Sequence, residues 1–197
     1  MFAVKPGRLL SVPGRGEHAQ DCLSARVQAR FADALVVHRL DMATSGLMLF
    51  ARGADAQRRL SIAFAQREVH KRYVAVVHGS LAAAQGEIDL PLGADWPNRP
   101  QQKVDLEHGK PSLTRYRALA FDPLADSTRL ELEPVTGRAH QLRVHLLAIG
   151  HPILGDALYA PPEWRTRADR MLLHATLLRF NHPASGATLQ FESAVPF

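Results

Sequence analysis

Short apolar segments of the kind that form β-strands make up much of this chain, and most follow one another without a helical segment between them. They lie at 2–4, 9–12, 35–37, 46–51, 72–78, 86–90, 112–121, 128–135, 171–180 and 188–191. Apolar residues at helical spacing occur only at 21–31, 55–67 and 138–149. Parallel sheets need regular helical crossovers, so this order predicts an α+β fold with a mixed, mostly antiparallel sheet flanked by helices, not a doubly wound fold.

The helix boundaries follow from local signals. Asp21 is a plausible N-cap for a helix with Leu23, Val27 and Phe31 on one stripe. The amphipathic helix over 138–149 is preceded by Gly137 and closed by Gly150. The polar, basic segment 95–111 is expected to form an exposed loop or hairpin.

Length and composition exclude several classes of protein. The 197 residues suffice for one domain with a sizeable core, so a single domain over 1–197 is expected. A content of 46% hydrophobic and 22% charged residues excludes a disordered or collagen-like chain. Cys22 is the only cysteine, which rules out an internal disulfide and a zinc site built on paired thiolates. The 24 basic against 19 acidic residues give a charge of +5, which is compatible with a nucleic-acid partner.

No segment has the pattern of a secretory signal or a membrane span. Residues 1–16 carry prolines, glycines and basic side chains, and apolar runs such as 47–51 fall far short of the roughly 18 residues that a span needs. A cytoplasmic location without a membrane partner is therefore the expectation.

The loop at 38–46 concentrates the polar chemistry of the chain. It joins two apolar strands and holds Arg39, Asp41, two hydroxyl side chains and Gly46 within nine residues. A polar loop between buried strands is a rigid support for a reactive side chain. The spacing alone also fits an ordinary turn in which Gly46 supplies a positive φ, and turns of this kind are the more common case.

A second polar stretch lies at 137–145. Arg138 is expected in the first turn of its helix, where the helix dipole disfavours a cation. This placement points to pairing with a carboxylate, although an exposed arginine with its head group in water is the commoner situation. His140 and His145 are five residues apart, a poor spacing for two ligands on one helical face, so no metal site is expected here.

These segments together resemble the RluA family of pseudouridine synthases. The resemblance rests on 38–41 with 44–46, on 71–75 and on 137–145, in the order found in the family, and it continues through 151–156 and 172–175. It covers nearly the whole chain and implies a single-domain pseudouridine synthase fold with a catalytic cleft across the sheet. The stretches 9–15 and 95–100 are similar to a branch of the family that modifies both 23S ribosomal RNA and a tRNA anticodon stem-loop.

The resemblance implies an isomerisation of uridine in RNA. The N-glycosidic bond breaks, the uracil turns and carbon 5 joins the same sugar carbon, so no cofactor and no metal are expected. Asp41 matches the catalytic aspartate, which acts on the sugar carbon or in a proton transfer through a glycal-like intermediate. Arg138 matches the residue that keeps it ionised, an effect typically worth about 1–3 pKa units. Tyr73 matches the aromatic residue that lies against the flipped uracil, either by stacking alone or also by assisting removal of the carbon 5 proton. Without the resemblance it would be interpreted as a core tyrosine.

Further residues are expected to bind the RNA. Leu142 either lines the uracil pocket or is plain core, and Arg39 either fills the gap left by the flipped base or contacts phosphate. Cations that grip phosphate along the rim, or are simply solvated, are Arg15, Arg67, Arg99, Lys103 and Arg143. The RNA target is expected to be a single-stranded loop.

The chain also departs from the family pattern. Relatives carry an additional acidic strand and turn first, so the expectation is either that the start has been assigned late or that the first strand is truncated. Gly7 lies one place early, and Ala139 replaces a common hydroxyl residue. No RNA-binding module of the S4 type is expected, and a monomer is expected. The alternatives are an inactive RNA-binding protein with the same fold and a hydrolase that uses Asp41 and nearby histidines.

Overall fold

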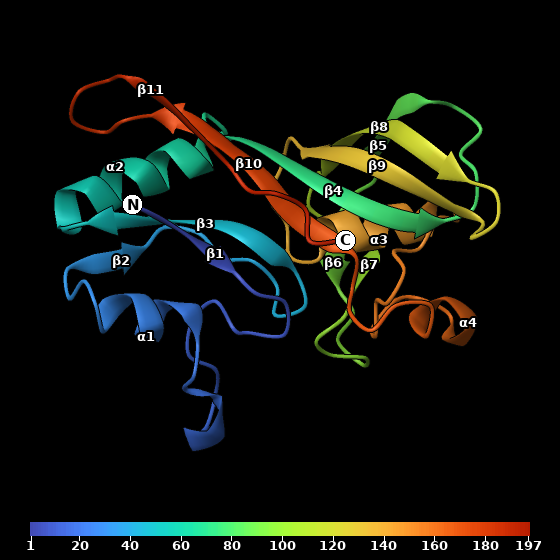
Figure 1. The fold of residues 1–197 in the computed structure, drawn as a ribbon, viewed down its shortest axis with the longest axis horizontal. Coiled ribbons are helices and arrows are strands. Elements are labelled where there is room, and N and C mark those ends of the chain that lie inside the picture. The colour runs from blue at the N-terminus through green and yellow to red at the C-terminus, as the bar shows by residue number, and fades with distance from the viewer. The chain divides into compact units, whose positions relative to one another are not determined.

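The computed structural model describes residues 1–197, which form eleven strands, four α-helices and one short 3-10 helix (Figure 1). The chain divides into two compact units. Unit 1 contains Met1–Lys71 and His174–Pro196, and unit 2 contains Arg72–Leu173 with Phe197. No helix is both long and apolar enough to span a membrane. The single domain expected over 1–197 stays a prediction.

Unit 1 is built around the strand β3. Antiparallel partners are β1, which pairs Phe2 with Leu49, and β2, which pairs Leu35 with Ala51. The strand β10 runs parallel to β3 and antiparallel to β11. The elements are β1 (Phe2–Lys5), η1 (Glu17–Ala19), α1 (Leu23–Gln28), β2 (Ala34–Val36), β3 (Ser45–Arg52), α2 (Ala54–Ala65), β10 (Leu173–Asn181) and β11 (Thr188–Glu192).

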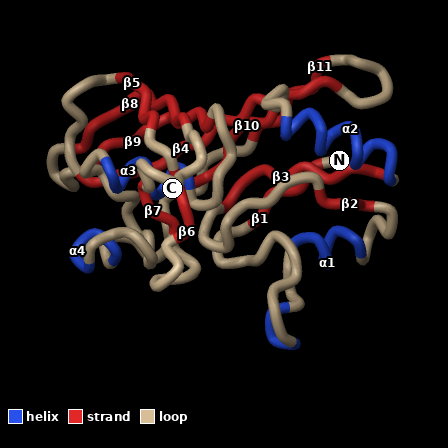
Figure 2. Tube along the Cα trace, turned by 180° about the vertical axis from the view of Figure 1, so that it is seen from behind, coloured by secondary structure: helices blue, strands red, loops and turns tan.

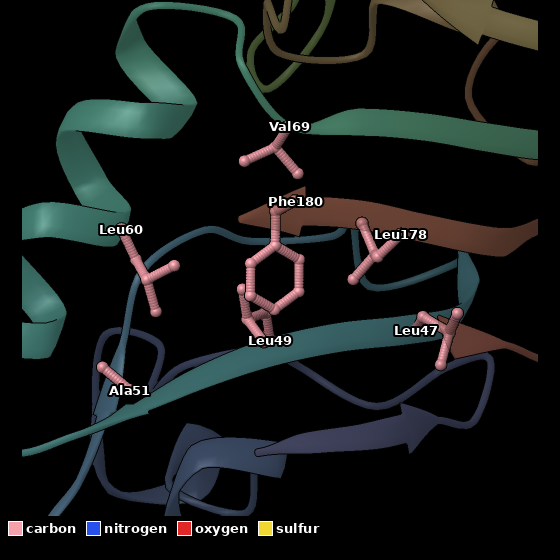
Figure 3. Close-up of a cluster of buried hydrophobic side chains, with 7 residues drawn as sticks. All are labelled: Leu47, Leu49, Ala51, Leu60, Val69, Leu178 and Phe180. Carbon is pink, nitrogen blue, oxygen red and sulfur yellow. The ribbon is translucent and has the colours of Figure 1, made fainter. Parts of the chain in front are cut away.

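The apolar run of β3 is explained by burial of both of its faces. Alternate side chains of a strand point to opposite faces, so Leu47 and Leu49 join a cluster with Leu60 of α2 and Phe180 of β10 (Figure 3). Met48 and Phe50 lie in a second cluster. Such continuous apolar sequences are typical of strands that are covered on both sides. Each buried Leu or Phe contributes about 1.5–3 kcal/mol to folding, which makes β3 a firm support for the loop before it.

Unit 2 holds an antiparallel sheet in which β9 lies between β4 and β8, and β8 also pairs with β5. A separate hairpin is formed by β6 and β7, and Figure 2 distinguishes the strands, helices and loops of each unit. The elements are β4 (His70–His78), β5 (Gln85–Asp89), β6 (Leu92–Ala94), β7 (Gln102–Val104), β8 (Leu113–Asp122), β9 (Ser127–Pro134), α3 (Gln141–Ala148) and α4 (Pro162–Arg165).

The predicted fold class is confirmed. Within each unit every strand pairing is antiparallel except that of β10 with β3, and helices accompany the sheets. The segment expected as a loop or hairpin at 95–111 contains β7 and the turn between β6 and β7. The strand expected at 9–12 is absent, because only an isolated bridge between Leu10 and Cys22 forms there.

Two helix starts differ from the prediction. The N-cap of α1 is Cys22, whose sulfur accepts from the Ala25 N–H. The Asp21 carboxylate does not cap the helix because it accepts from Nε of Arg26 at 2.8 Å and from one terminal nitrogen at 2.7 Å. The helix also ends at Gln28, before Phe31.

The correction at α3 matters for function. This helix begins at Gln141, because its N-cap His140 has a φ of 54° and breaks the helical path. Arg138 therefore lies in the preceding turn, and the expectation that it sits in the first helical turn against the dipole is wrong. The predicted amphipathic character is wrong too, since every residue from Gln141 to Leu146 is buried.

Candidate active site

The loop that carries Asp41 is fixed at the residue before it. The buried Ser11 hydroxyl donates to the Leu40 carbonyl at 2.6 Å and accepts from the Leu40 N–H at 3.0 Å. Both backbone polar groups of Leu40 are thus satisfied by one side chain from a distant part of unit 1. The Asp41 side chain itself is half-buried.

The residue after Asp41 is held by a buried cation. Lys5, with no exposed surface, donates from Nζ to the carbonyls of Leu9 at 2.7 Å, Pro6 at 3.0 Å and Met42 at 3.0 Å. Burial of an ammonium group is costly unless its hydrogen bonds are satisfied, and here three carbonyls satisfy it. The Asp41 carbonyl accepts from the Thr44 N–H at 3.1 Å, which closes the turn.

The end of the loop is fixed by close contact with β10. Gly46 has a φ of 115°, and a Cβ at this position would lie 2.3 Å from the Ala175 carbonyl oxygen, so only glycine fits. The positive φ expected at this residue is confirmed. Next to it, Ser45 Oγ lies 2.7 Å from His174 Nδ1, and His174 Nε2 lies 3.1 Å from Ser193 Oγ.

His38 holds the start of the loop as a neutral imidazole. Its Nε2 accepts from the Leu49 N–H at 2.8 Å, and its ring stacks on Phe64 at 4.5 Å. Burial, with a smaller contribution from the Lys71 charge, lowers the pKa of His38 to about 3. The sequence motif gave no sign of this role. Arg39 next to it has an exposed side chain.

The turn that carries Arg138 has a fixed backbone. The buried Gln141 accepts at Oε1 from the Arg138 N–H at 3.0 Å and from the Thr136 hydroxyl at 2.7 Å. Its Nε2 donates to the Leu113 carbonyl and to Thr114 Oγ1. The Arg138 side chain is exposed, and its Nε donates to the Pro111 carbonyl at 3.4 Å. The turn is therefore rigid in its backbone while its guanidinium faces solvent.

The two histidines of this stretch contact other polar groups of the protein. His145 is fully buried, and its ring nitrogens lie 2.9 Å from Thr114 Oγ1 and 3.0 Å from the Leu90 carbonyl. Burial lowers its pKa, against the opposing effects of that carbonyl and of Asp89. No group of three or more His, Cys, Asp or Glu side chains in the chain is arranged to hold a metal ion.

Arg143 is not a rim residue. It is only 3% exposed, and its Nε and one terminal nitrogen each lie 2.7 Å from a different oxygen of Asp156, which is 1% exposed. Asp156 also accepts from the backbone N–H groups of Leu158 and Tyr159. The expectation that Arg143 grips phosphate at the surface is therefore wrong: Asp156, distant in sequence, draws it into the interior.

The remaining predicted residues differ in their burial and belong to both units. Leu142 is buried at the start of α3, and Tyr73 is half-buried on β4 opposite Leu132. The side chains of the other four predicted rim cations are exposed: Arg15, Arg67, Arg99 and Lys103. Asp41 and Arg39 belong to unit 1, whereas Tyr73, Arg138 and Leu142 belong to unit 2.

Comparison with known proteins identifies the family. Residues 1–148 match the family described as RNA pseudouridylate synthase. The chain is 51% identical over 198 aligned residues to the dual-specificity RNA pseudouridine synthase RluA of Escherichia coli K12, covering all of this chain and 90% of that protein. It is 50% identical to the protein of the same name from Yersinia pestis, covering all of this chain and 95% of the relative.

A solved structure agrees with these relatives. The human RNA pseudouridylate synthase domain containing 1 superposes with a TM-score of 0.82 at 29% identity, over all of this chain and 80% of that one. The chain therefore belongs to the RNA pseudouridylate synthase family. It is an enzyme that isomerises uridine to pseudouridine in RNA.

Proposed function

We propose that Asp41 is the catalytic carboxylate of this enzyme, that Arg138 keeps it ionised and that Tyr73 stacks on the target uracil. The observation that carries the proposal is the fixation of the Asp41 loop from both sides, by Ser11 at Leu40 and by Lys5 at Met42. Catalysis needs the reacting group held within a fraction of an ångström of its productive position. An ordinary surface turn needs no buried cation beneath it.

The chemistry assigns each group a role. The bond from uracil N1 to the sugar C1′ breaks, a bond from C5 to C1′ forms, the C5 proton leaves and N1 gains a proton. Asp41 acts as a carboxylate, either by attack on C1′ or by proton transfer through a glycal-like intermediate. The guanidinium of Arg138 stabilises that carboxylate, and the fixed turn at Gln141 limits where it can reach.

The target nucleotide has to leave its stack before Asp41 can reach it. Flipping costs a few kcal/mol, and stacking on an aromatic ring such as that of Tyr73 returns about 1–3 kcal/mol. Leu142 contributes an apolar wall to the uracil pocket, and Arg39 either fills the gap in the RNA or contacts phosphate. These roles belong to the proposal.

The RNA is gripped by exposed cations. Arg15, Arg67, Arg99 and Lys103 are available for phosphate contacts, because each side chain is exposed. If all four contact phosphates, the logarithm of the affinity falls with the logarithm of the salt concentration with a slope of about −3.

We further propose that 23S ribosomal RNA and a tRNA anticodon stem-loop are both substrates. Support comes from the relatives whose name includes dual specificity and from the resemblance at 9–15 and 95–100. A monomer that works in the cytoplasm, where these RNAs are found, is part of the same proposal.

The test uses the proton that leaves carbon 5. Transcripts of a 23S fragment and of an anticodon stem-loop are made with tritium at uridine C5, and release of tritium into water is followed. The proposal expects release from both RNAs, and none above background from Asp41→Asn, which keeps the shape of the side chain. Full activity of Asp41→Asn would overturn it. RNA binding without release would favour the inactive alternative, and strand cleavage would favour a hydrolase.

A further inference from the structure

The loop between β6 and β7 exposes a tryptophan that the fold does not use. Trp96 is 67% exposed, and the guanidinium of Arg99 lies 3.6 Å from the centroid of its ring. The other tryptophan of the chain, Trp164, stacks on His78 at 3.6 Å and has Arg167 over its ring at 5.3 Å. Trp164 is thus half-buried and engaged within unit 2, whereas most of the Trp96 indole faces solvent.

The loop that presents Trp96 is closed by its own hydrogen bonds. The Asp95 N–H donates to the Gln101 carbonyl at 3.0 Å, and the Asn98 N–H donates to the Asp95 carbonyl at 3.1 Å. Asn98 Nδ2 also donates to an Asp95 carboxylate oxygen at 2.9 Å. These contacts fix the turn, so Trp96 is presented without a large entropic cost of ordering the loop on binding.

The hairpin is also tied to the segment that carries Arg138. Leu92 of β6 packs in a cluster with Val144 of α3 and with Tyr159. The Tyr159 hydroxyl accepts from the Gln102 N–H of β7 at 2.8 Å and lies 2.6 Å from Nδ1 of His140, the N-cap of α3. The loop beyond β6 and β7, seen in Figures 1 and 2, is therefore held in a set position relative to that end of α3.

The exposed ring of Trp96 and the positive charge of Arg99 together favour binding to nucleic acid. Arg99 is exposed and has no carboxylate partner within the chain, so its guanidinium is available to a phosphate. Every nucleobase has a π-face that stacks on an indole, and arginine adds a cation–π contribution. An exposed aromatic ring beside an unpaired cation thus fits an unstacked base with its phosphate better than it fits an apolar protein surface.

We propose that Trp96 and Arg99 bind one unpaired nucleobase of the substrate RNA, distinct from the uridine that is isomerised. The base stacks on the open part of the indole, and the guanidinium contacts the adjoining phosphate. The inference rests on the RNA substrate of the proposed function but requires no turnover. The pair would thereby help to select RNAs with an unpaired base at a set distance from the target uridine.

The first experiment measures the fluorescence of Trp96. The variant Trp164→Phe leaves Trp96 as the only tryptophan and keeps an aromatic ring on His78. Titration with an anticodon stem-loop transcript is expected to quench the Trp96 fluorescence in a saturable manner, because a stacked base quenches an indole. A fully paired RNA duplex of the same length is expected to quench much less. The same titration in Asp41→Asn should give the same quenching, which separates this proposal from the assignment of Asp41.

The second experiment measures the contribution to binding. Trp96→Ala is expected to raise Kd and KM for the stem-loop about 5- to 100-fold with kcat at saturating RNA nearly unchanged, and Trp96→Phe should recover most of the affinity. Arg99→Gln should weaken binding less and lower the salt slope by about 1. Leu124→Ala is the matched control, since Leu124 is 97% exposed on the β8–β9 turn, and it should bind like the unmodified protein.

Several outcomes would overturn the proposal. In the binding experiment, an unchanged Kd in Trp96→Ala would do so. In the fluorescence experiment, equal quenching by duplex and stem-loop would do so, as would a saturated complex whose Trp96 emission equals that of the free protein. A protein that self-associates through Trp96, seen as a concentration-dependent mass lost in Trp96→Ala with RNA affinity intact, would do the same.

Discussion

The loop that carries Asp41 and the turn that carries Arg138 both have backbones fixed by buried polar side chains. Their charged side chains differ in how far they are exposed to solvent. Lys5 and Ser11 fix the residues on either side of Asp41, and the Asp41 side chain is half-buried. Gln141 fixes the Arg138 backbone, while the Arg138 guanidinium is exposed.

The difference bears on the two catalytic roles that we propose for these residues. A carboxylate that reacts with the sugar has to be in place before the RNA arrives, because its position decides the geometry of the transition state. A long guanidinium side chain on a fixed backbone can instead take up many positions by rotation about its bonds. Mutations beneath the two backbones should therefore change stability, whereas mutation of the Arg138 head group should change activity alone.

The largest effect is expected for the buried ion pair that supports α3. Arg143→Met leaves the Asp156 carboxylate buried without its cation, so the free energy of unfolding should fall by about 3–5 kcal/mol. Urea titration followed by circular dichroism measures this. Arg115→Ala, which breaks the exposed pair with Glu87, is the control and should change stability little. A small effect of Arg143→Met would mean that the ion pair with Asp156 does not stabilise α3, the helix that follows Arg138.

Arg138→Gln should separate activity from stability. Loss of the cation that we propose to stabilise the Asp41 carboxylate should lower kcat by about 10²–10³-fold, the effect of removing one fixed electrostatic partner in comparable sites. Because the Arg138 side chain is exposed, the urea midpoint should stay close to that of the unmodified protein. Tritium release from a uridine-labelled stem-loop gives kcat. A destabilised variant, or one with undiminished kcat, would remove the distinction between the two segments.

Lys5→Met should weaken the support beneath Asp41. The substitution leaves the carbonyls of Pro6, Leu9 and Met42 without their shared donor, and we expect a loss of about 2–3 kcal/mol of unfolding free energy. At a temperature where the variant remains folded, kcat should fall about tenfold because Asp41 is less well positioned. Unchanged kcat would show that Met42 need not be held for Asp41 to act.

The smallest effect is a pH dependence from His38. Its pKa is about 3 in the folded protein against 6.5 in the unfolded chain, so the unfolded chain binds the proton more readily. Well above pH 6.5 His38 is neutral in both states and does not change the free energy of unfolding. As the pH falls toward 3 the free energy of unfolding decreases, by about 1.5 kcal/mol between pH 6.5 and pH 5. His38→Gln removes this titration. Equal pH dependence of the two proteins would show that His38 does not stay neutral at the start of the Asp41 loop.

Much of the unit 1 architecture could be predicted from local sequence. The apolar run at 46–51 is long enough to indicate a strand buried on both faces, and Gly46 indicates the positive φ at its start. The Lys5 contact to Met42 could not be predicted, because it joins residues 37 positions apart and lysine is normally a surface residue.

The start of α3 shows the limit of local reasoning in unit 2. Apolar spacing indicated a helix from residue 138, yet His140 takes a left-handed conformation and Gln141 bonds back to Thr136 and Arg138. Gln141 is buried among Leu113 and Thr114 of β8, and nothing in the spacing of the helix indicates that strand. Arg138 therefore precedes α3, and the argument from the helix dipole that drew attention to Arg138 does not apply.

The amino-acid sequence by itself determined the class of fold, the positions of most strands along the chain and the motifs that identify the family, because each depends on residues close together in the chain. Only the tertiary structure decided which charges are buried. Lys5 and Arg143 look like surface cations in sequence and are interior ones in the fold. The Met42 carbonyl, 37 positions away, joins two nearby carbonyls around Lys5, and the Asp156 carboxylate, 13 positions away, pairs with Arg143. Burial is a property of the assembled chain, and it requires partners that no local pattern contains.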